Sequence, residues 1–274
     1  MYRDKINLTH IHIRIPGLKR IHRFLHLTDA HLLLCDERDS EARRAFAESR
    51  RPVLAKGDLQ PEEALDLLWR YIAERSDSSH PDALDGLLLT GDMVDFPSQA
   101  NMDCLTAHMD ALTLPYVFAI GNHDWAFFDD CRTPHSKIAY RPLYSRWCEG
   151  NPFVHKKRIG GMTFVAVDNS LEAYEDGVAE TVADALHGEE HVILLQHNPF
   201  YSETMRDPSV DPTGRLNNNW KDVLALITAE TSPVRAVIAG HLHVRMENLL
   251  GERVPQYVTD HAAHGNGTIF TFGE

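Results

Sequence analysis

The stretch Ala119-Ile120-Gly121-Asn122-His123-Asp124 decides how the rest of the sequence can be interpreted. It ends an apolar run over residues 116–120, which is typical of a buried strand that stops at a glycine. The polar side chains after the glycine would stand at the end of a sheet, where ligands bind in open α/β folds. Gly-Asn is also a common turn dipeptide, so this stretch alone would not define a site.

Four other polar groups follow apolar runs in the same way. The runs lie at residues 21–27, 84–89, 192–195 and 234–239, and each predicts a strand. The groups that follow them are Thr28-Asp29-Ala30-His31, Thr90-Gly91-Asp92-Met93-Val94-Asp95, Gln196-His197-Asn198-Pro199 and Gly240-His241-Leu242-His243. Strands that alternate with helices form a sheet whose strand ends share one rim, so we expect these groups to lie together.

The other strands predicted by the sequence complete the sheets. Residues 9–15 alternate isoleucine with polar residues, which predicts an edge strand with His10 and His12 on its exposed face. Residues 162–167 predict another buried strand, and the tail after Arg253 predicts closing strands. The fold class is therefore α/β.

Helices and loops are predicted between these strands. Proline followed by two acids at residues 61–63 predicts a helix start, and Ser98 predicts the cap of the next helix. Residues 36–57 show little periodicity and are interpreted as loop or irregular helix. Residues 125–151 and 200–219 are interpreted as long functional loops that could carry specificity.

The composition limits the partners and the compartment. The chain has 274 residues, of which 43% are hydrophobic, and a formal net charge of −13, which argues against nonspecific binding to nucleic acid or to an anionic membrane. No signal peptide and no membrane span of about 18 apolar residues is predicted. The four cysteines show no CxxC spacing, so we expect free thiols and a cytoplasmic protein. The sequence does not indicate an oligomeric state.

The predicted rim is rich in residues that bind hard or borderline metals. Carboxylates, an amide oxygen and imidazoles suit divalent Mn, Fe or Zn, and the lack of a thiolate argues against a structural zinc site. The set is too large for one catalytic ion that keeps an open position, but it suits two ions with one bridging carboxylate. The residues are Asp29, His31, Asp92, Asn122, His123, His197, His241 and His243.

In this order and with these spacings, the five groups resemble the motifs of the calcineurin-like metallophosphoesterases. The resemblance covers about residues 20–272 and leaves an additional strand, at about residues 5–16, outside it. It implies a four-layer α/β/β/α sandwich with two mixed β-sheets and a dinuclear metal site at the strand ends. Because the polar groups run from Asp29 to His243, we expect a single domain over residues 1–274.

The resemblance also implies a role for each residue. The first ion would be held by Asp29, His31 and His243, and the second by Asn122, His197 and His241. Asp92 would bridge the two divalent ions (Mn, Fe or Zn). His123 would stabilise the phosphoryl transition state or protonate the leaving oxygen, with Asp124 orienting it by hydrogen bonding. Asp95 would contact the ligands without binding a metal ion itself.

The implied function is metal-dependent hydrolysis of a phosphate ester, with a small-molecule or nucleotide phosphodiester as the expected substrate. A phosphomonoesterase, a nuclease and a non-catalytic metal-binding scaffold are the alternatives. Phe96-Pro97 and Asp124 depart from the phosphoprotein phosphatases, and Asp95 stands where purple acid phosphatases place a tyrosine. Gln196-His197-Asn198-Pro199 also differs from the motif common in the cyclic-nucleotide phosphodiesterases of the family.

Overall fold

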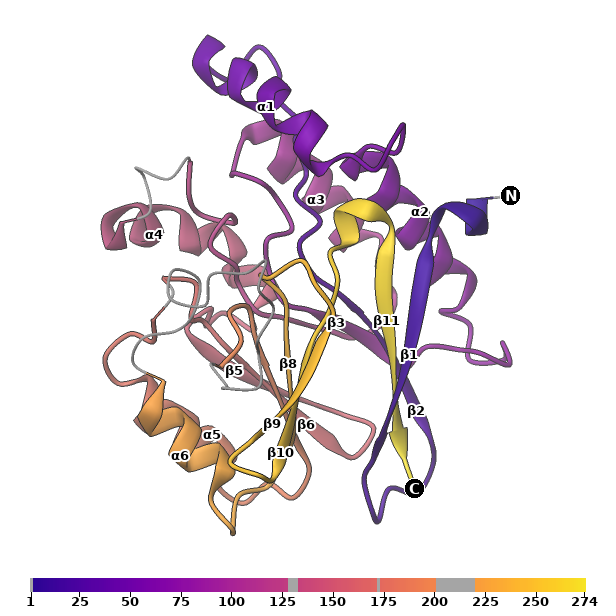
Figure 1. Ribbon diagram of the computed structural model, residues 1–274, viewed down its shortest axis with the longest axis vertical. Helices are drawn as coiled ribbons and strands as arrows, with labels where there is room; N and C mark the ends of the chain where they lie inside the picture. Colours follow the sequence, from indigo (N-terminus) through magenta and orange to yellow (C-terminus); the bar gives the residue numbers. More distant parts are fainter. Residues whose placement is uncertain (1, 128–132, 172, 201–219) are drawn as a thin grey trace.

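Five strands form the first sheet of the computed structural model, which describes residues 2–127, 133–171, 173–200 and 220–274 (Figure 1). Their order is β1-β11-β2-β3-β4, and only β11 and β2 pair antiparallel. The strands are β1 (Asn7–Arg14), β2 (His22–Leu27), β3 (Gly86–Leu89), β4 (Tyr116–Phe118) and β11 (Asn266–Gly273). The predicted N-terminal edge strand is confirmed, since β1 pairs with β11 and exposes His10 and His12.

Six strands form the second sheet, in the order β5-β6-β7-β8-β10-β9. The pairs at its two ends are antiparallel and the inner pairs are parallel, so both sheets are mixed. The strands are β5 (Val154–Ile159), β6 (Met162–Val167), β7 (Val192–Gln196), β8 (Val234–Ala239), β9 (Met246–Leu250) and β10 (Val254–Val258). The sequence pattern had predicted β6, β7 and β8 but not β5 or β9.

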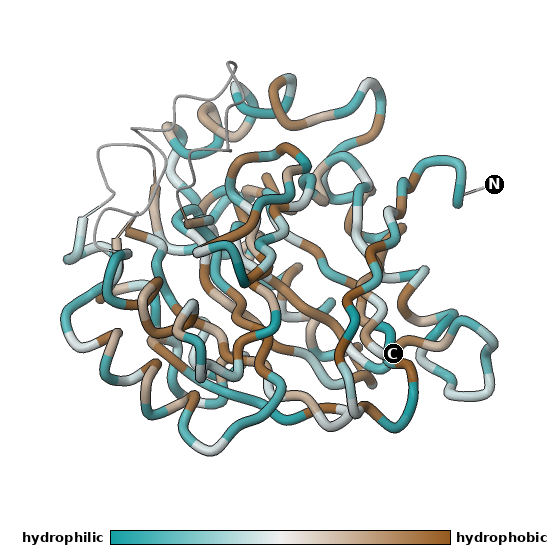
Figure 2. Tube along the Cα trace, turned by 60° about the horizontal axis from the view of Figure 1, so that its bottom comes forward, coloured by the Kyte–Doolittle hydropathy of each residue, from teal (hydrophilic) through white to brown (hydrophobic). Residues whose placement is uncertain are grey.

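The two sheets pack face to face around an apolar core. Phe24 of β2 meets Phe164 of β6 across the sheets, with ring centroids 4.7 Å apart, and Phe272 of β11 packs edge-on against both rings. Figure 2 shows brown, apolar segments through the middle of the molecule and mostly teal loops around it. Burial of these aromatic and aliphatic side chains is the main term that holds the sheets together.

Helices cover the outer face of each sheet. On the first sheet, α2 (Pro61–Glu74) and α3 (Gln99–Asp110) bury Leu68, Ile72 and Leu105 in one cluster with β2 and β3. On the second sheet, α5 (Val178–Leu186) and α6 (Lys221–Thr228) pack against β6, β7 and β8. The predicted starts of α2 and α3 are confirmed, and Ser98 accepts the N–H of Asn101 at 3.0 Å as a helix cap. The four-layer α/β/β/α arrangement is therefore as predicted.

Residues 36–57 are more regular than the sequence pattern indicated. They contain the helix α1 (Glu41–Leu54), which lies at one end of the molecule (Figure 1). The Ser40 hydroxyl caps it by accepting the N–H of Arg43. Only Ala47 and Leu54 are buried, and the segment has too few apolar residues for a helix to be recognised in the sequence.

We expected residues 125–151 to form a long functional loop, but the described part of this range is largely helical. It forms α4 (Pro134–Tyr140) and the 3-10 helix η3 (Arg141–Trp147). Residues 128–132, and residues 201–219 of the other expected loop, lie outside the described part. Trp125, Tyr144 and Trp147 are buried in the core under the first sheet. Aromatic residues bury large apolar areas, and the polar ends of two of them find partners here: Trp125 Nε1 donates to Ser170 Oγ, and the Tyr144 hydroxyl donates to the carbonyl of Asp124.

Two further predictions concern cysteines and the membrane. Cys35, Cys104 and Cys148 are free thiols, as expected, whereas Cys131 lies outside the described residues. Among the helices of the described ranges, we find none with the length and apolar character to cross a membrane. The short 3-10 helices η1 (Tyr2–Lys5) and η4 (Ala262–His264) complete the secondary structure.

Candidate metal centre

Five loops at the ends of β2, β3, β4, β7 and β8 meet at one rim and bring the predicted residues together. Backbone hydrogen bonds align the first two loops: Asp29 N–H donates to Gly91 O and His31 N–H to Asp92 O, both at 2.9 Å. The loops of the second sheet are joined in the same way, since the Gly240 N–H donates to His197 O at 3.0 Å. The rim therefore draws on both sheets.

Glycines allow these loops to touch backbone to backbone. A Cβ at Gly121 would collide with the backbone nitrogen and the carboxylate of Asp92. A Cβ at Gly240 would collide with the side chains of Thr28 and Asp29. Any larger residue at either position would push apart the loops that carry the candidate ligands.

The backbone of the rim is held in a costly conformation. Five predicted ligands have positive φ in the left-handed region, which is uncommon for residues other than glycine. Such conformations cost of order 1–3 kcal/mol each and cluster at functional sites, where the surrounding structure imposes them. The five are Asp29 (55°), His31 (46°), Asp92 (51°), His241 (71°) and His243 (55°).

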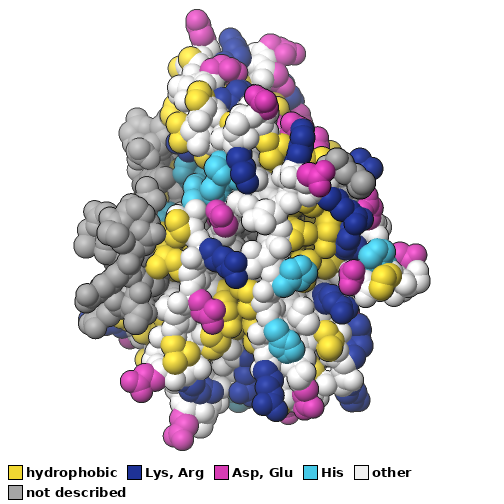
Figure 3. All heavy atoms as spheres, turned by 45° about the vertical axis from the view of Figure 1, so that its right-hand side comes forward, with side chains coloured by type: hydrophobic (Ala, Val, Ile, Leu, Met, Phe, Trp, Pro, Cys, Tyr) yellow, Lys and Arg dark blue, Asp and Glu magenta, His cyan; other side chains and the backbone are white. Residues whose placement is uncertain are grey.

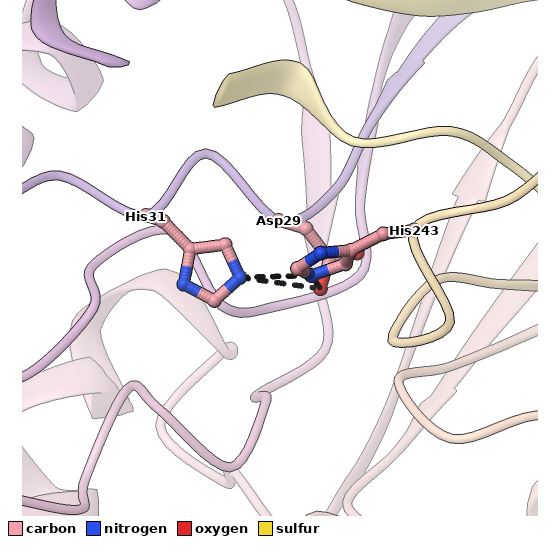
Figure 4. A group of neighbouring side chains, drawn as sticks. All are labelled: Asp29, His31 and His243. Carbon is pink, nitrogen blue, oxygen red and sulfur yellow. Dashed lines mark hydrogen bonds and ion pairs between the residues drawn. The ribbon is translucent and has the colours of Figure 1, made fainter. Parts of the chain in front are cut away.

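The first predicted ligand set converges on one point. His31 and His243 come from different loops, and both rings turn a nitrogen toward the carboxylate of Asp29 (Figure 4). The Nε2 atoms of the two histidines lie 3.0 Å apart, and Asp29 Oδ1 is 3.2 Å from His243 Nε2 and 3.7 Å from His31 Nε2. All three ligand atoms thus face one small volume, in which a cation could be held.

The second predicted set lies beside the first. His197 Nε2 is 3.2 Å from His241 Nδ1 and 3.1 Å from Asp92 Oδ2, and these three side chains could also hold an ion. Asn122 is buried, yet neither its side-chain oxygen nor its nitrogen has a hydrogen-bond partner within the described part of the chain. The same holds for His241 Nε2. Unpaired buried polar atoms are costly, and a metal ion at this place would give the Asn122 oxygen a partner.

Asp92 stands between the two sets. Its Oδ1 accepts the N–H of His123 at 2.7 Å, which fixes the carboxylate. Its Oδ2 is 3.1 Å from His197 Nε2 of one set and 3.9 Å from His31 Nε2 of the other. This oxygen is therefore placed where a bridging ligand would have to be.

A hydrogen bond on the side away from the site fixes the orientation of two histidine rings. His31 Nδ1 lies 2.9 Å from Asp95 Oδ1, and His197 Nδ1 donates to the carbonyl of Thr90 at 2.6 Å. In both rings Nδ1 makes this hydrogen bond, and Nε2 faces the other candidate ligands. Such outer partners set the tautomer and the aim of metal-binding histidines.

The carboxylates make the centre attractive to positive charge. Burial opposes a charged imidazole, but hydrogen bonds with Asp29 and Asp95 outweigh it and raise the pKa of His31 to about 10. Burial also opposes a charge on His197, whereas the charges of Asp92 and Asp29 raise its pKa to about 9. By contrast, burial and the charge of His197 lower the pKa of His241, which favours its neutral, metal-binding form. Protons on His31 and His197 occupy places that divalent cations would compete for.

His123 and Asp124 are placed differently from the prediction. His123 Nδ1 donates to the carbonyl of Asp95 at 2.8 Å and is 3.3 Å from Asp95 Oδ1. The Asp124 carboxylate instead accepts backbone N–H groups of the adjacent loops, from Gly121 at 2.8 Å, Met93 at 2.9 Å and Asp92 at 3.0 Å. The contact that orients the His123 ring is thus with Asp95, and Asp124 ties together the loops after β3 and β4.

Arg50 is a residue at this site that the sequence pattern did not indicate. It reaches from α1 and donates to both carboxylate oxygens of Asp95, at 2.8 and 3.0 Å. Burial opposes ionisation of Asp95, but the hydrogen bonds from His31 and Arg50 hold its pKa well below the usual range. A helix prediction over residues 41–54 would have been the necessary signal, and the low apolar content of this segment concealed it.

Comparisons with known proteins agree with this geometry. The family model described as calcineurin-like phosphoesterase matches residues 22–245. A solved dimetal phosphatase from Danio rerio superposes with a TM-score of 0.56 at 15% identity, covering 89% of this chain and 88% of that one. A 5'-nucleotidase from Candida albicans superposes with a TM-score of 0.46 at 14% identity, and the match covers 88% of this chain but 45% of that one. At such identities the superpositions speak for the fold alone. The search of curated proteins gave no match.

Proposed function

The chain belongs to the calcineurin-like phosphoesterase family, and from this we propose that it hydrolyses a phosphodiester of a small molecule or nucleotide at a dinuclear metal centre. Phosphoester hydrolysis is the activity of the family. The number of ions, their identity, the role of each ligand and the diester preference are our proposal.

The observation that carries the proposal is the convergence of two ligand sets on Asp92 Oδ2. Asp29, His31 and His243 would hold one ion. His197, His241 and the unpaired side-chain oxygen of Asn122 would hold the other. With N and O donors and no thiolate, Mn, Fe and Zn all suit the set. The Danio rerio neighbour, described as a dimetal phosphatase, has the same fold and supports two ions here.

The metal ligands and His123 would have different parts in the reaction. Two divalent ions, when bound, would neutralise the phosphoryl oxygens and activate water. His123 lies beside the ligands but keeps 22% of its side chain exposed, so it can reach a substrate. Its Nδ1 donates to the carbonyl of Asp95 at 2.8 Å and lies 3.3 Å from the Asp95 carboxylate, which holds the ring in place. From this position His123 would donate a proton to the leaving oxygen.

The alternatives receive less support. The net charge of −13 argues against a nuclease, and the face drawn in Figure 3 carries acidic and basic side chains interspersed rather than a basic stripe. A non-catalytic scaffold would not need His123 in addition to complete ligand sets. We also propose a single domain, because the ligands run from Asp29 to His243, and a reducing, cytoplasmic location, which the three free thiols support.

Hydrolysis of bis-p-nitrophenyl phosphate and of p-nitrophenyl phosphate, each with Mn²⁺ supplied, tests the proposal. We expect a marked preference for the diester. A preference for the monoester would instead indicate a phosphomonoesterase that acts on nucleotide or sugar phosphates. No turnover of either compound by protein with two ions bound would favour the scaffold.

A further inference from the structure

Arg50 connects helix α1 to the residues behind the candidate metal centre. Its Nε donates to Asp95 Oδ2 at 3.0 Å and its Nη2 to Asp95 Oδ1 at 2.8 Å. A bidentate pair of this kind fixes the plane of a carboxylate as well as its position. The Asp95 side chain is fully buried, whereas that of Arg50 is 27% exposed. The guanidinium therefore reaches inward from the helix and ends on a buried acid.

Asp95 contacts both kinds of residue that the proposed reaction needs. Its Oδ1 lies 2.9 Å from Nδ1 of His31, a candidate ligand of the first ion. The same oxygen is 3.3 Å from Nδ1 of His123, which would protonate the leaving group. A rotation of this carboxylate would disturb both rings at once, and the two hydrogen bonds from Arg50 oppose such a rotation.

We propose that Arg50 is a positioning residue that acts through Asp95 to fix the orientations of the His31 and His123 rings. It couples α1 to metal affinity through His31 and to turnover through His123. The effect on turnover rests on the proposed function, but the effect on metal affinity does not. Outer partners of metal-binding histidines change affinity or activity by about 10–100-fold.

Arg51 provides a matched control on the same helix. Its side chain is 28% exposed, close to that of Arg50, and it pairs with two acids, Glu62 at 3.1 Å and Glu48 at 3.5 Å. The variants are Arg50→Met, Arg50→Lys and Arg51→Met, each tested for Mn²⁺ affinity by calorimetry and for kcat and KM on the diester. We expect Arg50→Met to lose about tenfold or more in both affinity and kcat with little change in KM. Arg50→Lys keeps the charge but loses the bidentate hydrogen bonding of the guanidinium, so its metal affinity and kcat should be intermediate. Arg51→Met should match the unmodified protein in both quantities.

A double-mutant cycle with Asp95→Asn separates positioning from a merely structural effect. If Arg50 acts through Asp95, adding Arg50→Met to Asp95→Asn should cost little more than Asp95→Asn alone. Additive losses would overturn the proposal. So would equal behaviour of Arg50→Met and Arg51→Met, or a rise in KM with kcat and metal affinity unchanged, which would mean direct substrate binding by Arg50.

Two further outcomes, failure of a variant to fold and absence of turnover in the unmodified protein, are interpreted separately. If Arg50→Met does not fold, the same comparison is made between Arg50→Lys and Arg51→Lys, and equal metal affinities would overturn the proposal. If the unmodified protein binds two ions without turning over either ester, the proposed function fails, and the metal affinities alone decide the role of Arg50.

Discussion

The imidazole of His123 is partly exposed, although Asp95 beside it is buried. The side chain of His123 is 22% exposed and that of Asp95 is 0% exposed, while the candidate ligands His31 and His243 are 1% and 33% exposed. A partly exposed ring that is held by Asp95 can reach a substrate and keep its orientation. We therefore expect His123→Ala to lower kcat by about 10²–10⁴-fold, the usual contribution of a general acid. Metal content, measured by elemental analysis, should be retained, and an equal loss of metal would refute the assigned role.

Another single-residue prediction concerns His26, which lies behind the centre between two threonines. Its Nε2 is 2.8 Å from Thr90 Oγ1 and its Nδ1 is 2.9 Å from Thr259 Oγ1. Burial lowers its pKa to about 3, although the charge of Asp29 opposes this. The folded state therefore keeps His26 neutral while the unfolded chain takes up a proton below about pH 6.5. Its contribution to stability is present above that pH and is lost as the pH falls toward 3.

The free energies of unfolding of the unmodified protein and of His26→Gln should thus converge, or reverse in order, as the solution is acidified. The expected slope of their difference is about 1.4 kcal/mol per pH unit below pH 6, measured by urea unfolding at pH 7, 6 and 5. A constant difference across these pH values would show that His26 titrates alike in both states.

The roles of single residues were only partly predictable from the sequence. Each candidate ligand was identifiable because it follows an apolar run, and the structure brings all of them to one rim. The contact of Asp124, which was carried over from the family resemblance, was predicted wrongly. In a tight loop after β4, the Asp124 carboxylate turns toward backbone N–H groups, including that of Gly121, and Asp95 from the loop after β3 reaches the His123 ring.

At the scale of helices and strands, the sequence predicted an element correctly where the segment carries a strong apolar pattern. The strands β6 and β7 are buried throughout, β8 is buried except at Arg235, and α2 has a full apolar stripe. It failed at residues 36–57 and 125–151, where tertiary contacts decide. Helix α1 is fixed by a cap and by ion pairs of its arginines, and the aromatic residues around η3 are buried by the neighbouring sheet.

Helix α4 depends on a buried ion pair that the sequence could not indicate. Lys137 has a side chain only 2% exposed, and its Nζ lies 2.9 Å from Asp168 Oδ2 and 2.7 Å from Glu175 Oε1. Removing Lys137 leaves the buried Asp168 carboxylate with a more distant cation, Arg141 at 3.7 Å, so Lys137→Met should cost about 3 kcal/mol in free energy of unfolding. Lys156→Met is the matched control: that side chain is 37% exposed, pairs with Glu189, and should cost less than about 1 kcal/mol. Equal losses in urea unfolding would show that the pair at Lys137 has no special weight.

At the scale of the whole molecule, the candidate centre joins the two sheets. Asp29, His31, Asp92 and Asn122 follow strands of the first sheet, whereas His197, His241 and His243 follow strands of the second. Each proposed ion therefore takes ligands from both sheets. The ions would act as cross-links at the rim, in addition to the apolar core that holds the sheets together deeper inside.

Removal of the metal should consequently destabilise both sheets together. A site filled at a hundredfold excess over its Kd stabilises the folded state by about 2.7 kcal/mol. For a protein of this size that corresponds to a fall in Tm of roughly 5–10 °C per site on chelation. Calorimetry with Mn²⁺ and with a chelator should show one transition that shifts as a whole. The Asp92→Asn variant, which lacks the bridging charge, should shift much less. An unchanged Tm, or a shift in only part of a divided transition, would contradict a centre shared between the sheets.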